Sequence, residues 1–242
     1  MTPDVAPETG RSLVEDGRRL LGECKLFRGL GADERRTLFA RSRIRNFAAG
    51  ETIFLMGSPG DNMMAVLSGN VRISLSSSDG RELLLAILFP GEFFGEISLL
   101  DGKERTADAT AATACSLAIL DRREVLTFFA RYPSAWLNIV NVLCNRLRKT
   151  DEHIAEVALL QLPARLARAL LRVLAGGDAP PAAGKTEPIA LSQGDLGKLV
   201  GAARESVNRC LRTWQQDGVI AIKGGLIVVN DRAALEELAE AG

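Results

Sequence analysis

Short apolar or alternating segments recur between residues 44 and 121, and turn-forming residues separate them. Many short strands at intervals of roughly ten residues are typical of an all-β roll or barrel. The segments are ETIFLM, MMAVLSG, NVRISLS, RELLLAIL, GEFFG and ADATAATACSLAIL. The turns contain Ala49-Gly50, Pro59-Gly60-Asp61, Ser68-Gly69-Asn70, Asp79-Gly80 and Pro90-Gly91. We therefore expect this part of the chain to form a β-roll, preceded by a short helix near residues 32–42.

The pattern becomes helical after Tyr132. No glycine follows until after Leu160, and Pro133 suits the first turn of a helix. Mainly apolar residues then recur at alternating intervals of four and three positions. This spacing is typical of the a/d seam of a heptad repeat. The seam consists of Trp136, Val140, Leu143, Leu147, Thr150, Ile154 and Val157. We expect a parallel dimer helix, the alternative being a helix packed on its own β domain. The polar Thr150 indicates register control or a polar contact.

The C-terminal part contains the signals of two short helices joined by a turn. After an amphipathic segment at 163–174 comes GGDAPPAAGKTEP, a predicted loop. Ser192 is a suitable N-cap, and Gly201 suits the turn that ends that helix. A second helix is expected from Ala203 to Gly218, which completes the outline of a helix-turn-helix. The segment VIAIKGGLIVV then predicts a hairpin that would serve as a wing.

The outward face of the second helix suits DNA. Arginine can donate two hydrogen bonds to guanine O6 and N7, and glutamate can accept one from cytosine N4. Base edges are reached from the first turn of a recognition helix. The face carries Arg204, Glu205, Asn208, Arg209 and Arg212. The alternative for this face is a solvated helix surface that carries some arginines.

Composition excludes several classes of protein. Lys and Arg number 30, as do Asp and Glu, so only a local basic face can indicate nucleic acid. The four cysteines form no CxxC pair and fit neither a zinc site nor a disulfide framework. The single histidine, His153, lies in DEHIAE and is expected to be solvated. No apolar run reaches about 18 residues and no signal peptide is evident, so we expect a cytoplasmic protein without a membrane segment.

The stretch FGEISLLDGKERTA, residues 94–107, combines groups that can receive a phosphate attached to a sugar. Gly95 offers backbone without a side chain, and Glu96 offers a carboxylate. Arg105 offers a rigid cationic fork, and Thr106 a hydroxyl. The alternative is that Glu96 and Arg105 form a structural salt bridge with each other.

From about residue 25 to 232, the chain resembles the cyclic-AMP receptor protein and FNR (CRP/FNR) superfamily of bacterial transcription regulators. GETIF, SPGDNMMAVLSGNVRI and FGEISLL…RTA resemble its cyclic-nucleotide module, RLRKTDEHI its dimer helix and ARESVNRCL its recognition helix. The resemblance implies an α+β fold: a double-stranded β-roll, a long dimerisation helix and a C-terminal winged helix-turn-helix. The implied parts are an extension at 1–24, the roll at 25–132, the dimerisation helix at 133–161 and the DNA-binding domain at 162–242.

The resemblance also implies a nucleotide site. In the family, Arg105 would pair with the cyclic phosphate, Thr106 would add its hydroxyl, and Glu96 would accept the ribose 2′-OH. Thr150 aligns with a threonine that contacts adenine. Asp151 stands where the cyclic-AMP receptor pattern has a serine from the partner subunit, which leaves cyclic GMP open beside cyclic AMP, or leaves Asp151 facing water. The implied nucleotide-binding residues are Gly95, Glu96, Ile97, Ser98, Arg105, Thr106, Thr150 and Asp151.

For DNA, the resemblance implies that Arg204, Glu205 and Arg209 read a half-site like TGTGA, repeated as a palindrome. It implies a homodimeric, cyclic-AMP-responsive transcription regulator that works with RNA polymerase and is not an enzyme. The loop 175–188 departs from the family pattern, so no polymerase-contacting surface is carried over. The main alternative is a regulator of the same fold that answers cyclic GMP, another effector or none. A non-DNA adaptor is a more distant alternative.

We expect no metal, haem or iron–sulfur cluster. An iron–sulfur relative would need clustered cysteines near the N-terminus, where Cys24 stands alone. A haem sensor of this family would use a His or Cys on the roll, where there is no His and Cys115 is isolated. No nucleophile–base pair that would support an enzyme is evident.

Overall fold

The computed structural model divides into two compact units, residues 1–73 with 88–145 and residues 74–87 with 146–242. The structure describes residues 31–77, 82–174, 189 and 191–241. The predicted extension at 1–24, the turn at Asp79-Gly80 and the loop at 175–188 lie outside these residues. Each unit is described by itself.

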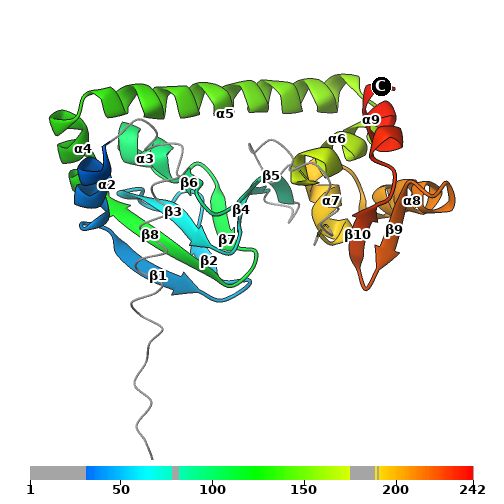
Figure 1. Ribbon diagram of the computed structural model, residues 1–242, viewed down its shortest axis with the longest axis horizontal. Coiled ribbons are helices and arrows are strands. Elements are labelled where there is room, and N and C mark those ends of the chain that lie inside the picture. Colours follow the sequence, from blue (N-terminus) through cyan, green and yellow to red (C-terminus); the bar gives the residue numbers. More distant parts are fainter. Residues whose placement is uncertain (1–30, 78–81, 175–188, 190, 242) are drawn as a thin grey trace, which may run out of the picture. The chain divides into compact units, whose positions relative to one another are not determined.

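Among the described residues, eight strands of the first half form two four-stranded sheets, as the roll pattern predicted (Figure 1). One sheet has the order β1-β8-β3-β6 and the other β2-β7-β4-β5. The strands are β1 (Arg43–Phe47), β2 (Thr52–Phe54), β3 (Asn62–Ser68), β4 (Val71–Ser76), β5 (Glu82–Leu88), β6 (Phe93–Phe94), β7 (Asp108–Ala111) and β8 (Cys115–Asp121). The segment ADATAATACSLAIL splits into β7 and β8. Strand β1 was not among the predicted segments.

The core of the roll lies on β3 and β8 and on the helices that cover them. Antiparallel pairing sets Met63 opposite Leu120 and Ala65 opposite Ala118. The helices of this unit are α2 (Ala32–Phe39), α3 (Glu96–Asp101), α4 (Arg122–Arg131) and the first part of α5 (Ser134–Leu159). Their buried residues share one apolar cluster that includes Leu38, Met63, Phe93, Leu99, Leu120, Val125, Phe128, Phe129, Ala135 and Ile139.

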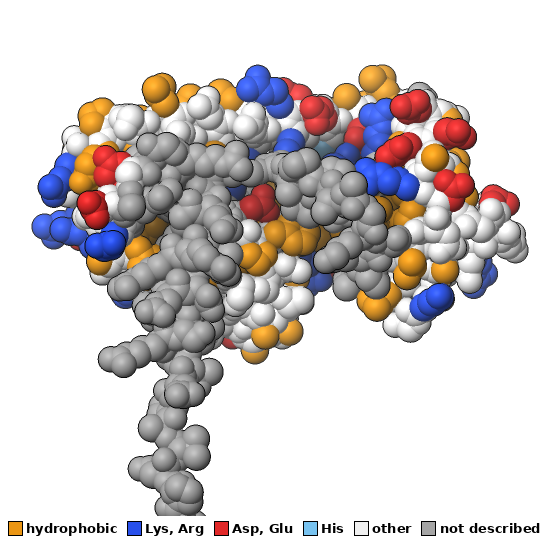
Figure 2. Space-filling model, viewed as in Figure 1, with side chains coloured by type: hydrophobic (Ala, Val, Ile, Leu, Met, Phe, Trp, Pro, Cys, Tyr) orange, Lys and Arg blue, Asp and Glu red, His pale blue; other side chains and the backbone are white. Residues whose placement is uncertain are grey.

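The long helix α5 has two different apolar faces. Ala135 and Ile139 are buried in the core of the roll. The predicted seam residues lie on another face and are largely exposed, Leu147 at 63% and Ile154 at 61%. Figure 2 shows hydrophobic side chains along α5 at the upper edge of the view. The first turns of α5 therefore pack on the chain's own β domain, as the alternative prediction had it. This packing does not cover the seam residues farther along the helix.

The second unit contains the predicted helix-turn-helix and wing. Besides the second part of α5 and most of β5, it contains α6 (Leu162–Leu174), α7 (Gln193–Val200), α8 (Arg204–Gln216), β9 (Ile220–Lys223), β10 (Leu226–Val229) and α9 (Arg232–Glu240). Gly224 and Gly225, both with positive φ, form the turn between β9 and β10. Ile189 pairs with Ile227 beside this hairpin. The unit has its own core, which includes Leu166, Leu170, Leu196, Val200, Val207, Leu211, Trp214, Ile220 and Leu235.

The expectation that His153 is solvated was wrong. Its side chain is 26% exposed, and its Nδ1 lies 4.0 Å from Oε2 of Glu156. Its Nε2 is buried and has no hydrogen-bond partner among the described residues. Glu156 is itself buried and accepts a 2.6 Å hydrogen bond from Nη1 of Arg172 on α6. Of the stretch DEHIAE, His153 and Glu156 are therefore turned toward α6, while Asp151, Glu152, Ile154 and Ala155 remain exposed.

None of the helices in the described ranges combines the length and the apolar character that a membrane span requires.

Candidate nucleotide and DNA sites

Arg105 is the centre of a buried polar cluster in the roll. Only 4% of its surface is exposed. Its Nη1 donates to the carbonyl of Gly95 and to the hydroxyl of Ser98, both at 3.0 Å, and its Nη2 donates to Oδ1 of Asn62 at 2.7 Å. The guanidinium also lies 4.2 Å from the centroid of the Phe54 ring, which favours a cation. The cationic fork is therefore held by three different segments of the roll, β2, β3 and the start of α3.

Two glycines allow the chain to close around this arginine. Gly95 begins α3 in the left-handed region, with φ of 79°. A Cβ on Gly95 would lie 2.5 Å from Nη1 of Arg105, so the guanidinium would have to shift. A Cβ on the buried Gly60 would lie 2.2 Å from the Cβ of Ser98. The local sequence thus permits a close approach of backbone to the fork.

The charge of Arg105 is incompletely compensated. Burial lowers the pKa of its guanidinium, whereas Asp61 and Glu96 raise it through their charges. Within the described residues, no carboxylate oxygen lies within ion-pair distance of Arg105, so the alternative of a direct Glu96–Arg105 salt bridge is wrong. Its Nε is buried without a hydrogen-bond partner among those residues. A buried cation bonded mainly to neutral oxygens is suited to an anion, because an anion would offset the desolvation of the guanidinium.

In the second unit, local sequence fixes the helix-turn-helix. The hydroxyl of Ser192 accepts from the backbone N–H of Asp195 at 3.0 Å and so caps α7, as predicted. Gly201 ends α7 with φ of 63°. Gly197 is buried where a Cβ would lie 2.7 Å from the carbonyl of Ala202, so α7 and the turn after it are in close contact. Helix α8 begins one residue after the predicted start, Ala203, and Gly218 follows its end.

The polar face of α8 is oriented as predicted. Val207, Leu211 and Trp214 are buried in the core of this unit. The opposite face is open to solvent at Arg204, Glu205, Arg209 and Arg212 and half open at Asn208.

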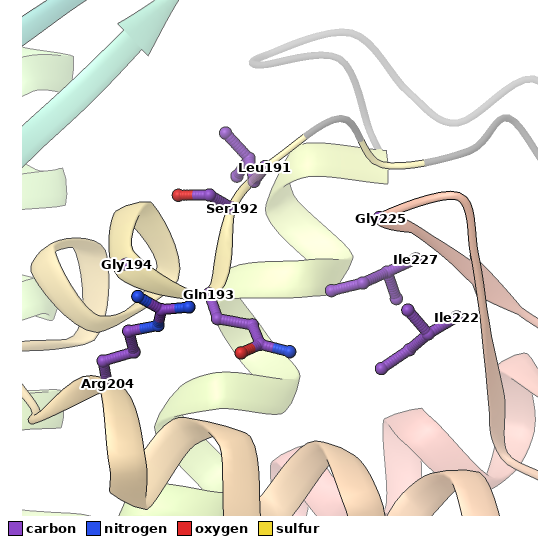
Figure 3. A pocket seen from close by; sticks show the side chains of 8 residues that line it. All are labelled: Leu191, Ser192, Gln193, Gly194, Arg204, Ile222, Gly225 and Ile227. Atoms are coloured by element: carbon purple, nitrogen blue, oxygen red, sulfur yellow. The ribbon is translucent and has the colours of Figure 1, made fainter.

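A hollow of about 340 Å³ lies beside this face, between the start of α7, the start of α8 and the wing. Figure 3 shows Arg204 and Gln193 extending into it, while Ile222 and Ile227 come from the wing. The helix-turn-helix and the wing therefore bound one surface that carries hydrogen-bond donors.

Comparisons with known proteins find a family match for the roll and another for the helix-turn-helix part. Residues 44–132 match the model of the cyclic nucleotide-binding domain, and residues 164–238 match that of the Crp-like helix-turn-helix domain. The chain is 31% identical to the CRP-like cAMP-activated global transcriptional regulator of Mycobacterium tuberculosis over 89% of this chain and 96% of that protein. The chain belongs to the CRP/FNR family of transcription regulators.

Two further matches support the assignment to the CRP/FNR family. The cyclic AMP receptor protein of Thermus thermophilus is 34% identical, over 88% of this chain and 96% of that protein. The solved structure of the c-di-GMP responsive global regulator CLP from Xanthomonas campestris has a TM-score of 0.71 at 27% identity, covering 82% of this chain and 99% of that one. A cyclic nucleotide-binding domain and a DNA-binding helix-turn-helix are thus the two functional modules of this CRP/FNR protein. Transcription regulators of this kind are not a class of enzyme.

The structure brings together only some of the residues predicted to hold a nucleotide. Arg105 contacts Gly95 and Ser98. Glu96 is buried, at 1% exposure, and its charge raises the pKa of Arg105. Ile97, Thr106, Thr150 and Asp151 are exposed.

Thr150 and Asp151 lie on the second part of α5. The hydroxyl of Thr150 donates to the carbonyl of Arg146 at 3.0 Å. Their role toward a nucleotide remains a prediction.

Two residues of the cluster around Arg105 were missed from the sequence. Asn62 accepts the hydrogen bond from Nη2 of Arg105, and Phe54 stacks on its guanidinium. Asn62 precedes Arg105 by 43 residues, so no local spacing connects the two. Asn62 belongs to the motif SPGDNMMAVLSGNVRI that carries the CRP/FNR resemblance. Membership of this motif is the sequence feature that could have marked Asn62 as a residue of the site.

Proposed function

We propose that this protein is a homodimeric transcription regulator whose binding to a DNA palindrome responds to a cyclic nucleotide, most directly cyclic AMP. The proposed parts are the nucleotide-binding roll at 25–132, the dimerisation helix at 133–161 and the DNA-binding domain at 162–242. Because it acts on DNA, we place it in the cytoplasm, with RNA polymerase as a further partner.

The observation that carries the proposal is the environment of Arg105. It is a buried cation with neutral hydrogen-bond partners and an unbonded Nε. A cyclic phosphate supplies a negative charge and acceptor oxygens to such a fork. Gly95 leaves room for backbone next to the phosphate, and Thr106 adds a hydroxyl at the exposed side. Glu96 would accept the ribose 2′-OH.

The choice of base is assigned to α5. Thr150 would contact adenine, and the relatives named for cyclic AMP support that choice. Asp151 is exposed and, when ionised, only accepts hydrogen bonds, so it suits the amino group of adenine or the N1–H and N2–H₂ of guanine. Cyclic GMP is therefore the competing ligand to be measured beside cyclic AMP.

The homodimer is assigned to the exposed seam of α5. A stripe of apolar side chains at heptad spacing is stable in water when a second helix covers it. The break between α5, which ends at Leu159, and α6, which begins at Leu162, would serve as the hinge toward the DNA-binding domain. A nucleotide bound between Arg105 and Thr150 would favour one of two arrangements of α5 and thereby change the affinity for DNA.

DNA readout is assigned to the exposed face of α8. Arg204, Glu205 and Arg209 would contact base edges of a TGTGA-like half-site, with Asn208 and Arg212 toward the backbone. Two such faces in a dimer would occupy half-sites one helical turn apart.

The nucleotide part is tested by calorimetric titration with cyclic AMP and cyclic GMP. We expect binding that Arg105→Leu abolishes and that Lys103→Leu, which removes an exposed cation two residues away, retains. The ratio of the two affinities then reports what Thr150 and Asp151 select. Equal binding by the unmodified chain and by Arg105→Leu would contradict the phosphate site. No binding of either nucleotide would leave a regulator with another effector or none.

The DNA part is tested by electrophoretic mobility on a TGTGA palindrome and on a scrambled duplex. Arg209→Ala should lose the preference for the palindrome, because one good bidentate contact is worth about 1–3 kcal/mol of discrimination per half-site. Arg232→Ala removes the same charge from exposed α9 and should retain the preference. A preference that survives Arg209→Ala would contradict the assigned readout.

A further inference from the structure

Arg122 joins the beginning of α4 to the end of the phosphate-site helix α3. Its Nε donates to the carbonyl of Leu99 at 2.6 Å, and its Nη2 reaches the carbonyl of Leu100 at 3.5 Å. The last carbonyls of a helix lack partners within the helix, and a cation there also complements the helix dipole. The side chain of Arg122 therefore fixes the C-terminal end of α3, whose other end carries Glu96 and Ser98.

The approach of Arg122 depends on the residue that ends α3. Gly102 adopts the left-handed region with φ of 73°. A Cβ at this position would lie 3.4 Å from Nη2 of Arg122, so the guanidinium packs directly on the glycine backbone. The contact is thus built into the turn after α3.

The backbone of Arg122 provides a second connection to the cluster around Arg105. Its N–H donates to the carbonyl of Asp61 at 2.7 Å. The carboxylate of Asp61 accepts from Nδ2 of Asn62 at 3.1 Å, and Oδ1 of Asn62 accepts from Nη2 of Arg105 at 2.7 Å. Arg122 is therefore connected to Arg105 both through α3 and through the start of β3.

Helix α4 carries this connection to α5. Phe129 of α4 shares the roll core with Leu99 of α3 and with Ile139 of α5. The ring centroids of Phe129 on α4 and Trp136 on α5 are 4.5 Å apart. Because packed cores rearrange between discrete arrangements and do not deform continuously, a shift of α3 has to be accommodated by α4 and the first turns of α5.

We propose that Arg122 is a positioning residue that couples the nucleotide site to α5 and thereby to DNA binding. The inference rests on the proposed function, since it concerns how an occupied nucleotide site changes affinity for DNA. Arg122 does not touch the nucleotide itself. It sets how far α3 and α4 move together.

Arg123 is a matched control for Arg122. It is the next residue of α4 and is exposed, and it lines the same shallow hollow as Arg122, together with Asp61 and Leu126. Its backbone carbonyl accepts a hydrogen bond from the hydroxyl of Thr127 at 2.7 Å. Replacing either arginine by glutamine removes the same charge from the same place, but only Arg122→Gln releases the end of α3.

The experiment measures a coupling factor, the ratio of the DNA dissociation constants without nucleotide and with saturating cyclic AMP. DNA affinity is followed by fluorescence anisotropy on the TGTGA palindrome, nucleotide affinity by calorimetry and folding by thermal melting. Arg122→Gln should lower the coupling factor about tenfold, within the usual range of coupling between sites. Arg123→Gln should keep it within about twofold. Arg122→Lys should lower it about threefold, because an ammonium lacks the fork that reaches both carbonyls.

A coupling factor that stays unchanged in Arg122→Gln overturns the inference, even if the variant melts earlier, because lost stability alone does not change this ratio. If Arg122→Gln does not fold, Arg122→Lys decides in the same way. An equal fall in both glutamine variants also overturns it, since charge alone would then suffice. If the unmodified chain binds no cyclic AMP, or its DNA affinity does not respond, the proposed function fails and this inference fails with it.

Discussion

The guanidinium of Arg105 packs against the backbone of Gly95: a Cβ on residue 95 would lie 2.5 Å from Nη1. The glycine of the Gly-Glu pair and the arginine of the Arg-Thr-Ala triplet are therefore one structural unit. Nη1 of Arg105 also donates to the carbonyl of Gly95 at 3.0 Å, so the two residues are in contact twice.

We predict that Gly95→Ala lowers nucleotide affinity at least tenfold and destabilises the roll. Alanine at positive φ costs roughly 1–2 kcal/mol, and the contact with Arg105 adds to this cost. Gly91→Ala is the matched control, because Gly91 also has positive φ, 88°, but a Cβ there would meet nothing within 4 Å. Calorimetry and urea unfolding should show the same backbone cost in both variants and a loss of affinity in Gly95→Ala alone. Equal nucleotide affinities would contradict the role of this contact.

We predict that Leu147→Glu makes the proposed dimer a monomer. Leu147 lies in the seam of α5 and is 63% exposed in the single chain, so a dimer would bury it. An unpaired carboxylate in a covered seam costs several kcal/mol. Leu159→Glu is the control, since Leu159 is 78% exposed on the same helix but lies off the seam, two residues beyond Val157. Analytical ultracentrifugation should find Leu159→Glu dimeric. A dimeric Leu147→Glu protein would refute the seam as the interface.

The sequence predicted those elements in which buried residues recur at the period of the strand or helix that they belong to. The roll and the helix-turn-helix have apolar spacing that matches what they bury, whereas the heptad seam of α5 is largely exposed in the single chain. Strand β1 does not: of its residues Arg43 to Phe47, only Phe47 is buried. This strand forms because its backbone pairs with β8, with Arg43 opposite Ile119 and Phe47 opposite Cys115. Pairing with a distant strand leaves no trace in the local hydrophobic pattern.

The candidate site shows the same limit. Gly95, Ser98 and Arg105 could be found because they lie within one short stretch. Asn62 and Phe54 complete the cluster from strands far along the chain, and only the fold brings them to Arg105.

We predict opposite effects of two glycine substitutions in α7. Gly197→Ala should destabilise the DNA-binding domain by about 1–3 kcal/mol, because its Cβ would lie 2.7 Å from the backbone carbonyl of Ala202. Gly194→Ala should be neutral or stabilising by up to about 1 kcal/mol, since its Cβ would lie at an ordinary 3.5 Å from the hydroxyl of Ser192 and alanine favours a helix. Urea unfolding measures both. A Gly197→Ala protein as stable as the unmodified chain would show that the turn between α7 and α8 can open without cost.

We predict that His153 makes the second unit less stable in mild acid. Burial lowers the pKa of its imidazole below the ordinary 6.5, and the positive charges of Arg172 and Arg165 lower it further, while Glu156 opposes them. Arg168, 3.9 Å from Glu156, is the other charged group of this cluster. Well above pH 6.5, His153 is neutral in both the folded and the unfolded chain. Below that value the unfolded chain binds the proton first, so the free energy of unfolding falls as the pH falls toward the folded pKa.

His153→Gln removes this proton uptake and keeps a polar side chain at the same position. The difference in the free energy of unfolding between the unmodified chain and His153→Gln should therefore be constant above about pH 7. Below about pH 6.5 it should change with a slope of at most roughly 1.4 kcal/mol per pH unit, the limit for one proton. Urea titrations from pH 5.5 to 8, at half-unit steps, measure the difference, and carboxylates that titrate in both proteins cancel from it. If the difference does not vary with pH, the imidazole titrates alike in the folded and unfolded chains, and the cluster around Glu156 does not act on it.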